Sequence, residues 1–272
     1  ALVTGVLTTT AATVFNGGFA SNAASTITVA DNSAALTLVS TDADANEGPI
    51  LRLYRNSADA ADNDIIGVIE FAMNKDNAGG NSAVNRIVNS IVDATNGSED
   101  ASLDIQLMEA GTIHSRLFFT PGETVFNESS RDQNFRVESN GNTHMLFVDA
   151  GNNRVGAGTA APDGTLHAYS GDAGSVGPSS QADDLVVENS AEGGITILTP
   201  DDSSARIRFS SPSTNTDVGG ASIFYRQNIN KLAIGTAVAG GTTVINSGAD
   251  APAVIPIDLI PSRARQSIFV SS

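Results

Sequence analysis

Few residues of this chain form patterns that could do chemistry, and the first is the run GAGTAA at residues 156–161. It fits the loose form G-x-G-x-x-A, in which glycines let the backbone approach a dinucleotide pyrophosphate at the start of a helix. Pro162 and Gly164 follow at once and disfavour that helix. No alternation of strands and helices surrounds the run, so we interpret it as a turn.

A second pattern resembles a calcium-binding loop. Asp42, Asp44 and Asn46 have the spacing of its first three ligands, but Glu47 stands where the loop needs Gly and Leu53 where it needs a bidentate Glu. The sequence therefore excludes an EF-hand. The cluster of Asp59, Asp62 and Asp64 leaves weak calcium binding open, although acidic residues in turns are more often solvated.

The remaining candidates for catalysis are also weak. His114, His144 and His167 lack the spacing of a helical zinc site, and we expect them in strands. No G-x-S-x-G elbow is present, and a Ser, His and Asp triad assembled only in the fold stays open. Among 30 acidic residues no carboxylate pair stands out for glycoside hydrolysis. We predict no catalytic, metal-binding or cofactor-binding residue, no cofactor, and no enzymatic activity.

The amino-acid composition indicates that strands and turns, rather than helices, would have to position any functional site. The 272-residue chain has no Cys and no Trp, 5% aromatic and 16% charged residues, and is rich in small polar and β-branched types. Such a composition favours strands and turns over helices. The absence of Cys excludes disulfides and thiolate metal sites. The net charge of -16 argues against a nucleic-acid partner, which needs Lys and Arg.

The first charged residue is Asp31, so residues 1–30 must be considered as a membrane span. Thr, Asn, Ser and Gly interrupt the stretch throughout, and no basic region precedes an apolar core, so we predict neither membrane insertion nor a signal peptide. Alternation on both sides of Asn16-Gly17-Gly18 instead predicts strands at residues 7–15 and 25–30. A flexible polar leader is the alternative.

Two repeats organise the chain. NRVGAGT at residues 153–159 returns as NKLAIGT at residues 230–236, each an Asn turn, a basic residue, a short apolar run and Gly-Thr. A longer block runs from residue 31 and returns near residue 189, with a strand, an acidic loop, an Arg-centred strand and a Gly-marked strand in the same order. We therefore predict duplicated β units, each closed by one copy of the short motif.

The Arg-centred strands raise the question of ligand contacts. Arg52 and Arg208 lie between apolar neighbours, so strand alternation places them on the opposite face. We interpret them as solvated residues or as partners in salt bridges near Asp64 and Asp217. Arg263 and Arg265 give the Pro-containing tail a local basic cluster.

Between the repeats, turn signals predict an antiparallel meander over residues 86–120, with turns at Asn96-Gly97 and Ala110-Gly111. A helix over residues 82–92 is the alternative, which the β-branched residues there disfavour. Further strands are expected at FRVES, HMLFVD, NRVGAGT and TLHAY, and residues 171–184 have the composition of a linker.

The predicted organisation has five parts. They are an N-terminal strand segment at 1–30, a first β module at 31–160, a strand and Gly/Ser/Pro linker at 161–184, a shorter β module at 185–236, and an extended Pro-containing segment at 237–272. The predicted fold class is all-β with little helix.

Several runs together resemble modules of tail fibre and related appendage proteins of marine bacteriophages. They are TTTAATVFNGGF, LTLVSTDADANEGPILRLYRNS, DNDIIGVIEF, VDATNGSED, FRVESNGNTHMLFVD and NNRVGAGTAAPDGTLH. The commoner form of the last run reads VGIGT followed by Ser/Thr, Pro and Leu-His. This chain keeps the Gly-Thr, Pro162, Leu166 and His167, with Ala157 in place of Ile.

This resemblance implies an elongated, modular β-sandwich or β-prism fibre, built as an intertwined homotrimer and located on the virion. Other virion proteins and a host cell-surface glycan or protein are the implied partners. A thread of short strands with few large side chains buries too little apolar surface alone, so burial between chains agrees with that expectation.

Three alternatives stay open at the level of the sequence. A capsid-borne fibre or decoration protein would share the same modules. A polysaccharide-degrading tailspike would differ by having a carboxylate pair in a groove. A bacterial surface adhesin is disfavoured because no export or anchoring signal is recognisable.

Overall fold

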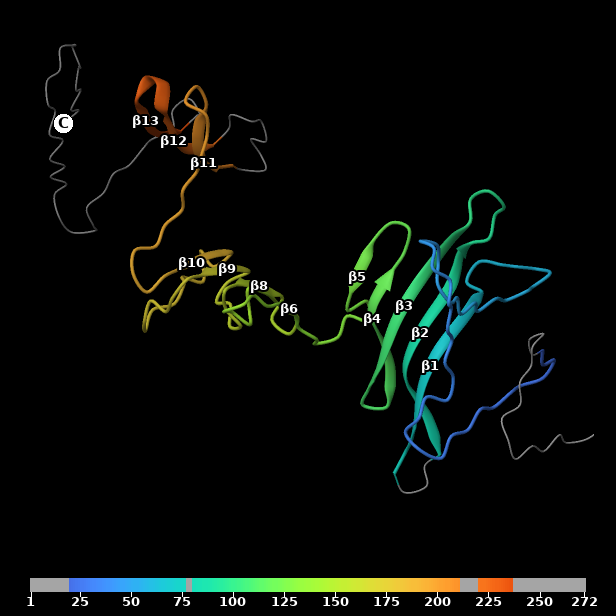
Figure 1. Ribbon diagram of the computed structural model, residues 1–272. Helices are drawn as coiled ribbons and strands as arrows, with labels where there is room; N and C mark the ends of the chain where they lie inside the picture. The colour runs from blue at the N-terminus through green and yellow to red at the C-terminus, as the bar shows by residue number, and fades with distance from the viewer. Residues whose placement is uncertain (1–19, 77–79, 211–219, 237–272) are drawn as a thin grey trace, which may run out of the picture. The chain divides into compact units, whose positions relative to one another are not determined.

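The computed structural model describes residues 20–76, 80–210 and 220–236 of the chain (Figure 1). The chain divides into two compact units, Ala1–Gln133 and Asn134–Ser272, and each is described by itself. Within the described residues the regular elements are strands, apart from one short 3-10 turn. The predicted all-β class is therefore confirmed.

The first unit contains one five-stranded antiparallel sheet in the order β1-β2-β3-β4-β5. Its strands are β1 (Ile65–Asn74), β2 (Asn81–Asp93), β3 (Asp100–Glu109), β4 (Thr112–Phe119) and β5 (Thr124–Phe126). The predicted meander is confirmed, and β2 occupies the stretch for which a helix was the alternative. Gly97 and Gly111 have φ of 88° and 83° in the predicted turns, a conformation that glycine adopts without steric cost.

One face of this sheet carries a continuous apolar row. Ile69, Ile87, Ile105, Leu117 and Phe126 are direct cross-strand partners from β1 to β5, so all five lie on the same face. Ile69 is 42% exposed and the three central residues are only half-buried. We name these five residues the apolar row. Within the described residues, its side chains contribute to no buried core.

The opposite face of the sheet is mixed. Val88, which pairs with Val68 and Asp104, is 7% exposed, and the Asp104 carboxylate accepts hydrogen bonds from Ser115 and Gln106. Glu70 and Arg86 pair across β1 and β2 at 3.6 Å. The first unit therefore has a small core and a polar network on one face, and its most regular apolar surface on the other.

Residues 20–60 contain no strand, so the strand predicted at residues 25–30 and the first two strands of the block predicted from residue 31, including the Arg-centred ILRLY at residues 50–54, are wrong. Short-range side-chain bonds compete with pairing there, as when Asp31 accepts the Ser33 N–H and Asp44 accepts the Asn46 N–H. Near its end the segment meets β1, where Arg55 pairs with Asp64 at 3.0 Å. The strand predicted at residues 7–15 lies outside the described residues.

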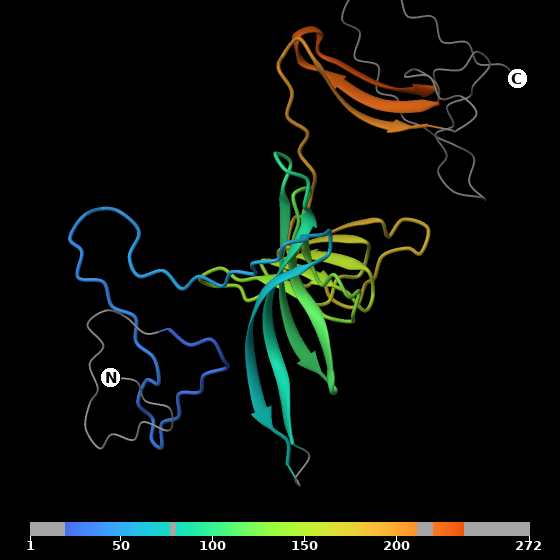
Figure 2. The same cartoon turned by 90° about the vertical axis from the view of Figure 1, so that its right-hand side faces the viewer.

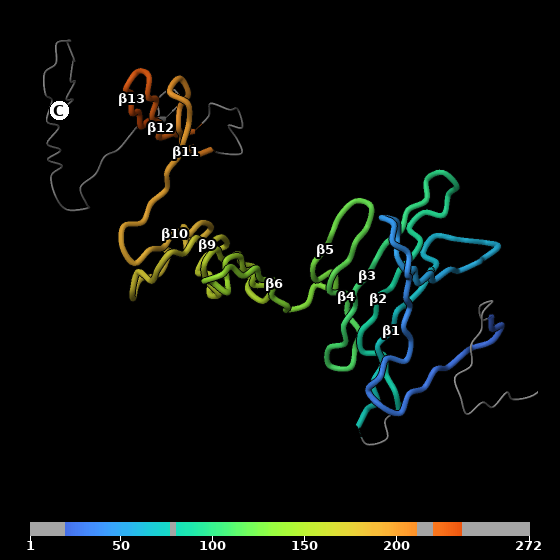
Figure 3. Tube along the Cα trace, in the orientation of Figure 1, coloured from blue at the N-terminus to red at the C-terminus, as the bar shows by residue number. Residues whose placement is uncertain are grey.

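The second unit begins with a five-stranded sheet in the order β10-β9-β8-β7-β6. Its strands are β6 (Phe135–Val137), β7 (Leu146–Asp149), β8 (Arg154–Ala157), β9 (Leu166–Tyr169) and β10 (Leu185–Glu188), and the trace can be followed in Figure 3. The first three pair antiparallel, whereas β8, β9 and β10 pair parallel. Phe147, at 6% exposed, and His167 are its buried side chains.

The stretch predicted as a linker connects two strands of this one sheet. Residues 171–184 run from β9 to its parallel neighbour β10, and the last two residues of the segment bond to the sheet, where Thr165 N–H donates to Asp183 O and Leu166 N–H to Asp184 O. The Gly, Ser and Pro composition is that of a crossover loop rather than of a spacer between modules. Leu185, the predicted first residue of the second module, is the first residue of β10.

A three-stranded antiparallel sheet follows, with strands β11 (Ser204–Phe209), β12 (Ala221–Arg226) and β13 (Lys231–Thr236), seen side by side in Figure 2. The 3-10 turn η2 (Gln227–Ile229) and Asn230, with φ of 46°, connect β12 to β13. This confirms the predicted Arg-centred and Gly-marked strands of the second repeat. The apolar run at residues 195–198 forms no strand, contrary to the prediction.

The Pro-containing tail at residues 237–272, including Arg263 and Arg265, lies outside the described residues. No helix in the described part of the chain has the length and apolar character needed to cross a membrane.

Candidate functional site

The most concentrated set of polar chemistry surrounds His167 on β9. This side chain is 1% exposed, and its ring packs edge-on against Tyr169 at 5.8 Å between centroids. Its Nδ1 accepts the backbone N–H of Asp163 at 3.2 Å. The Leu-His pair of the sequence motif therefore places Leu166, at 45% exposed, outward and His167 inward, as strand alternation requires.

Glu188 on β10 is the second member of the set. Its Oε1 accepts the N–H of Ala173 at 2.8 Å, and its Oε2 lies 3.1 Å from His167 Nε2. The ring nitrogen makes no hydrogen bond of good geometry with that oxygen, so the two groups are in close polar contact only. His167 and Glu188 thus tie together two parallel strands and the crossover loop between them. We call these two residues and the Asp163 backbone N–H the histidine clamp.

A metal ion is the first chemical possibility for this cluster. One ligand atom each from Asp163, His167 and Glu188 lies within 4.8 Å of the others, and within the described residues this is the one such group. A histidine binds a metal through a nitrogen lone pair. The Asp163 N–H already uses the Nδ1 lone pair, which leaves the proton of neutral imidazole on Nε2 facing Glu188. The donor set as built therefore does not fit a metal.

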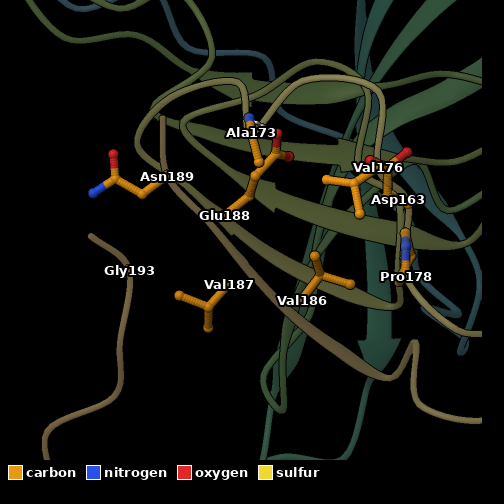
Figure 4. Close-up of a pocket in the computed structure, with 10 residues that line it drawn as sticks. Asp163, Ala173, Val176, Pro178, Val186, Val187, Glu188, Asn189 and Gly193 are labelled. Carbon is orange, nitrogen blue, oxygen red and sulfur yellow. Dashed lines mark hydrogen bonds between the residues drawn. The ribbon is translucent and has the colours of Figure 1, made fainter. Parts of the chain in front are cut away.

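A cavity of about 360 Å³ adjoins the clamp (Figure 4). Asp163 and Glu188 supply its carboxylates, and Val176, Pro178 and Val186 are among its apolar neighbours. Its lining residues include no aromatic side chain on which a sugar or base could stack. The arrangement can hold water or a small polar group beside two acids, and Glu188 is already engaged by Ala173 and His167.

The two glycines of NRVGAGT are needed because a side chain at either position would collide with a nearby backbone carbonyl. Gly158 has φ of 95°, and a Cβ on it would collide with the carbonyl oxygen of Tyr169; a Cβ on Gly156 would lie 2.5 Å from the carbonyl oxygen of Thr159. The Gly158 N–H donates to the carbonyl of His144. A bend and β9 follow the run, with no helix, which supports the turn interpretation over a dinucleotide site.

The acidic clusters of the first unit do not assemble into an ion site. Asp42 and Asp44 accept backbone N–H groups two residues ahead, and Asp62 accepts the N–H of Ala94. Asp64 pairs with Arg55 and accepts the N–H of Ala61. Asp64 thus pairs with Arg55 rather than with Arg52, and Arg52 is exposed, which agrees with the solvated alternative predicted for it. Asp217 lies outside the described residues.

The three histidines do not converge. His114 lies on β4 and His167 on β9, as predicted, whereas His144 lies in the turn before β7 with its ring edge-on to Phe147. Glu188 and Asp163 were missed as partners of His167, because neither has a sequence signal. The parallel pairing of β9 with β10 brings them together.

Comparison with known protein families and with curated proteins gives no match for this chain.

Proposed function

We propose that this protein is a structural component of a bacteriophage virion, a tail fibre or related appendage that works as a homotrimer and displays binding surfaces to the host. The resemblance of the sequence modules supports the virion assignment. The observation that supports self-association is the apolar row, five large side chains that cross a whole sheet on one face.

A single chain buries little apolar surface by itself. It would bury too little to fold stably if the apolar row also stayed exposed to water. Among the described residues the large buried apolar side chains are few, with Val88, Phe147 and Pro162 in the buried class, and Phe71 and Leu107 extend the apolar row with exposures of 54% and 39%. Folding requires burial that offsets about 1–2 kcal/mol of backbone entropy per residue. An antiparallel sheet normally packs one face on a core. A second and third copy of the chain supply that core, and a closed assembly also protects the sheet edges.

The test compares two lysine substitutions on strand β3. Ile105→Lys places a charge in the centre of the apolar row, whereas Gln106→Lys places one on the opposite face beside Asp104. Light scattering coupled to size exclusion should give three chains for the wild type and for Gln106→Lys, and smaller species for Ile105→Lys. A compact, soluble wild-type monomer would refute self-association.

The virion assignment needs its own measurement. Antibody labelling of intact virions in electron microscopy should place the protein on an appendage. Label at the tail supports the tail fibre, and label on the capsid supports the capsid-borne alternative. Label on neither would refute both.

An acid-catalysed polysaccharide hydrolase is the second candidate, because one oxygen of Asp163 and one of Glu188 lie within 4.8 Å beside a cavity. Glycosidases use such carboxylate pairs. We favour the non-enzymatic function because Glu188 already accepts a backbone N–H and contacts His167. Incubation with acidic and neutral bacterial polysaccharides should release no new reducing ends. Release that Glu188→Gln abolishes would establish the hydrolase instead.

A further inference from the structure

The three-stranded sheet β11–β13 has two faces of opposite character. Ile207, Ile223 and Ile234 are direct cross-strand partners, and they are 49%, 36% and 57% exposed. Tyr225 and Leu232 form the neighbouring pair on that face. Ile195 and Ile197 approach it across a groove of about 270 Å³. In the trimer proposed above, neighbouring chains cover this apolar face, which leaves the opposite face for display.

The outward face concentrates positive charge. Cross-strand pairing arranges nine residues there in three rows, which are Ser204, Arg226 and Lys231; Arg206, Phe224 and Ala233; and Arg208, Ser222 and Gly235. Four of the 14 Lys and Arg residues of the chain therefore share one small surface. We call the nine residues the basic face. The sequence did not reveal it, because the four cations come from three strands.

Contacts with Phe224 hold two of these cations in place. The guanidinium carbon of Arg206 lies 5.1 Å from the ring centroid and Lys231 Nζ lies 5.7 Å from it. These residues come from the strands on either side of β12, which carries Phe224. Cation–π attraction of this kind orders a long side chain without neutralising its charge. Both cations are thus preorganised and remain available to an anion.

The basic face has no acidic partners in the part of the chain that the structure describes. The ion pairs there involve other residues, and Arg226 donates instead to the backbone carbonyl of Asp202 at 2.6 Å. The protein as a whole carries a net charge of -16. At physiological salt the Debye length is about 8 Å, so a ligand on this face responds mainly to the local positive charge.

We propose that the basic face binds an acidic polysaccharide, through carboxylate or sulfate groups paired with Arg206, Arg208 and Lys231. The inference rests on the proposed function, in which this face is displayed to the host. Guanidinium groups bind such anions through two parallel hydrogen bonds. Ser222 and Gly235, which share the row of Arg208, have a small side chain and none at all. They leave space for a sugar chain beside the cation.

Single-stranded nucleic acid is the competing polyanion, and two features disfavour it. Proteins that bind it offer aromatic rings on which successive bases stack. The basic face has one aromatic ring, and Arg206 and Lys231 already lie over it. The net charge of -16 also opposes a densely charged phosphate backbone.

The experiment measures binding of the full chain to polygalacturonate fragments, with neutral dextran and a deoxythymidine oligomer as comparison probes. The test variant is Arg206→Gln with Lys231→Gln. The matched control is Arg52→Gln with Lys75→Gln, which removes two exposed positive charges from the first unit. We expect the wild type to bind polygalacturonate, with Kd raised about tenfold or more in the test variant, because each charge-assisted bond contributes over 1 kcal/mol. The control variant should keep the wild-type Kd.

Phe224→Leu keeps all the charges but removes the ring, and it should weaken binding less than the double charge variant. Equal loss in the test and control variants, absent polygalacturonate binding, or tighter binding of the oligomer would overturn the inference. Light scattering on the same samples separates this result from the proposed function. A monomer that still binds polygalacturonate through the basic face refutes the trimer and leaves the binding site standing.

Discussion

Replacing His167 tests whether the histidine clamp organises the second unit. His167→Leu keeps most of the side-chain volume but removes the acceptor of the Asp163 N–H and the group that faces Glu188. Asp163 is an exposed residue, so loss of its hydrogen bond to His167 costs about 0.5–1.5 kcal/mol, and the half-buried Glu188 carboxylate that loses its partner adds to that. We expect the β9–β10 region to lose about 1–3 kcal/mol of stability.

The stability lost on replacing His167 depends on whether the Glu188 carboxylate remains without its partner. His167→Leu combined with Glu188→Leu removes both polar partners, so the carboxylate is no longer buried without compensation. Replacement of both members of a buried pair is often close to neutral. The double variant should therefore be more stable than the sum of the single variants predicts, with a coupling of about 1–2 kcal/mol.

Hydrogen exchange read by mass spectrometry is the suitable assay, because a chain with two units need not unfold in one step. Peptides that cover β9 and β10 report the local free energy of opening, and peptides from β2 and β3 in the first unit serve as an internal control. His167→Leu should accelerate exchange in the former only. Unchanged or slower exchange there would refute the clamp. Protection of the wild type by one equivalent of Zn²⁺ would contradict the tautomer assignment.

Two further predictions concern local geometry. Gly156→Ala should destabilise the end of β8, because the added Cβ meets the Thr159 carbonyl. Ala233→Gly, at the equivalent position of β13, should cost only about 0.5–1 kcal/mol of strand preference. Hydrogen exchange of the peptides that contain positions 156 and 233 compares the two effects. The Thr95 side chain and N–H lower the pKa of Asp93, so the turn after β2 gains stability above the ordinary carboxyl pKa and loses it as pH falls through the lowered value. Asp93→Asn should remove this pH dependence of exchange at residues 94–98, and an unchanged profile would contradict it.

The sequence predicts the strands that have their partners close along the chain. The meander β1–β5 and the hairpins of β11–β13 follow from alternation and from turn residues, and these signals act over a few positions. The Arg-centred run ILRLY at residues 50–54 alternates equally well but forms no strand in the described chain. A strand needs a hydrogen-bonding neighbour, and the pattern of one segment does not specify which segment that will be.

The candidate sites were less predictable than the strands, because they depend on registers between distant segments. His167 was visible in the Leu-His motif, but its contact with Glu188 requires the parallel pairing of β9 with β10. The basic face likewise depends on the register of β11 against β12 and of β12 against β13. Single Arg and Lys residues on separate strands resemble ordinary solvated charges until that register is known.

The two copies of the short repeat begin in the same way but lie in sheets of different kinds. Asn153 and Asn230 both adopt positive φ, at 56° and 46°, and both open a strand with a basic residue. In the first copy the chain bends back at Thr159, so position 156 must be Gly to admit the Thr159 carbonyl. In the second copy the strand continues to Thr236, and Ala233 occupies the equivalent position. The Gly-to-Ala difference between the copies therefore matches their geometry: the first copy ends in a bend inside a mixed sheet, where a Cβ at position 156 would meet the Thr159 carbonyl, and the second continues as the edge strand of an antiparallel sheet, where Ala233 is accommodated.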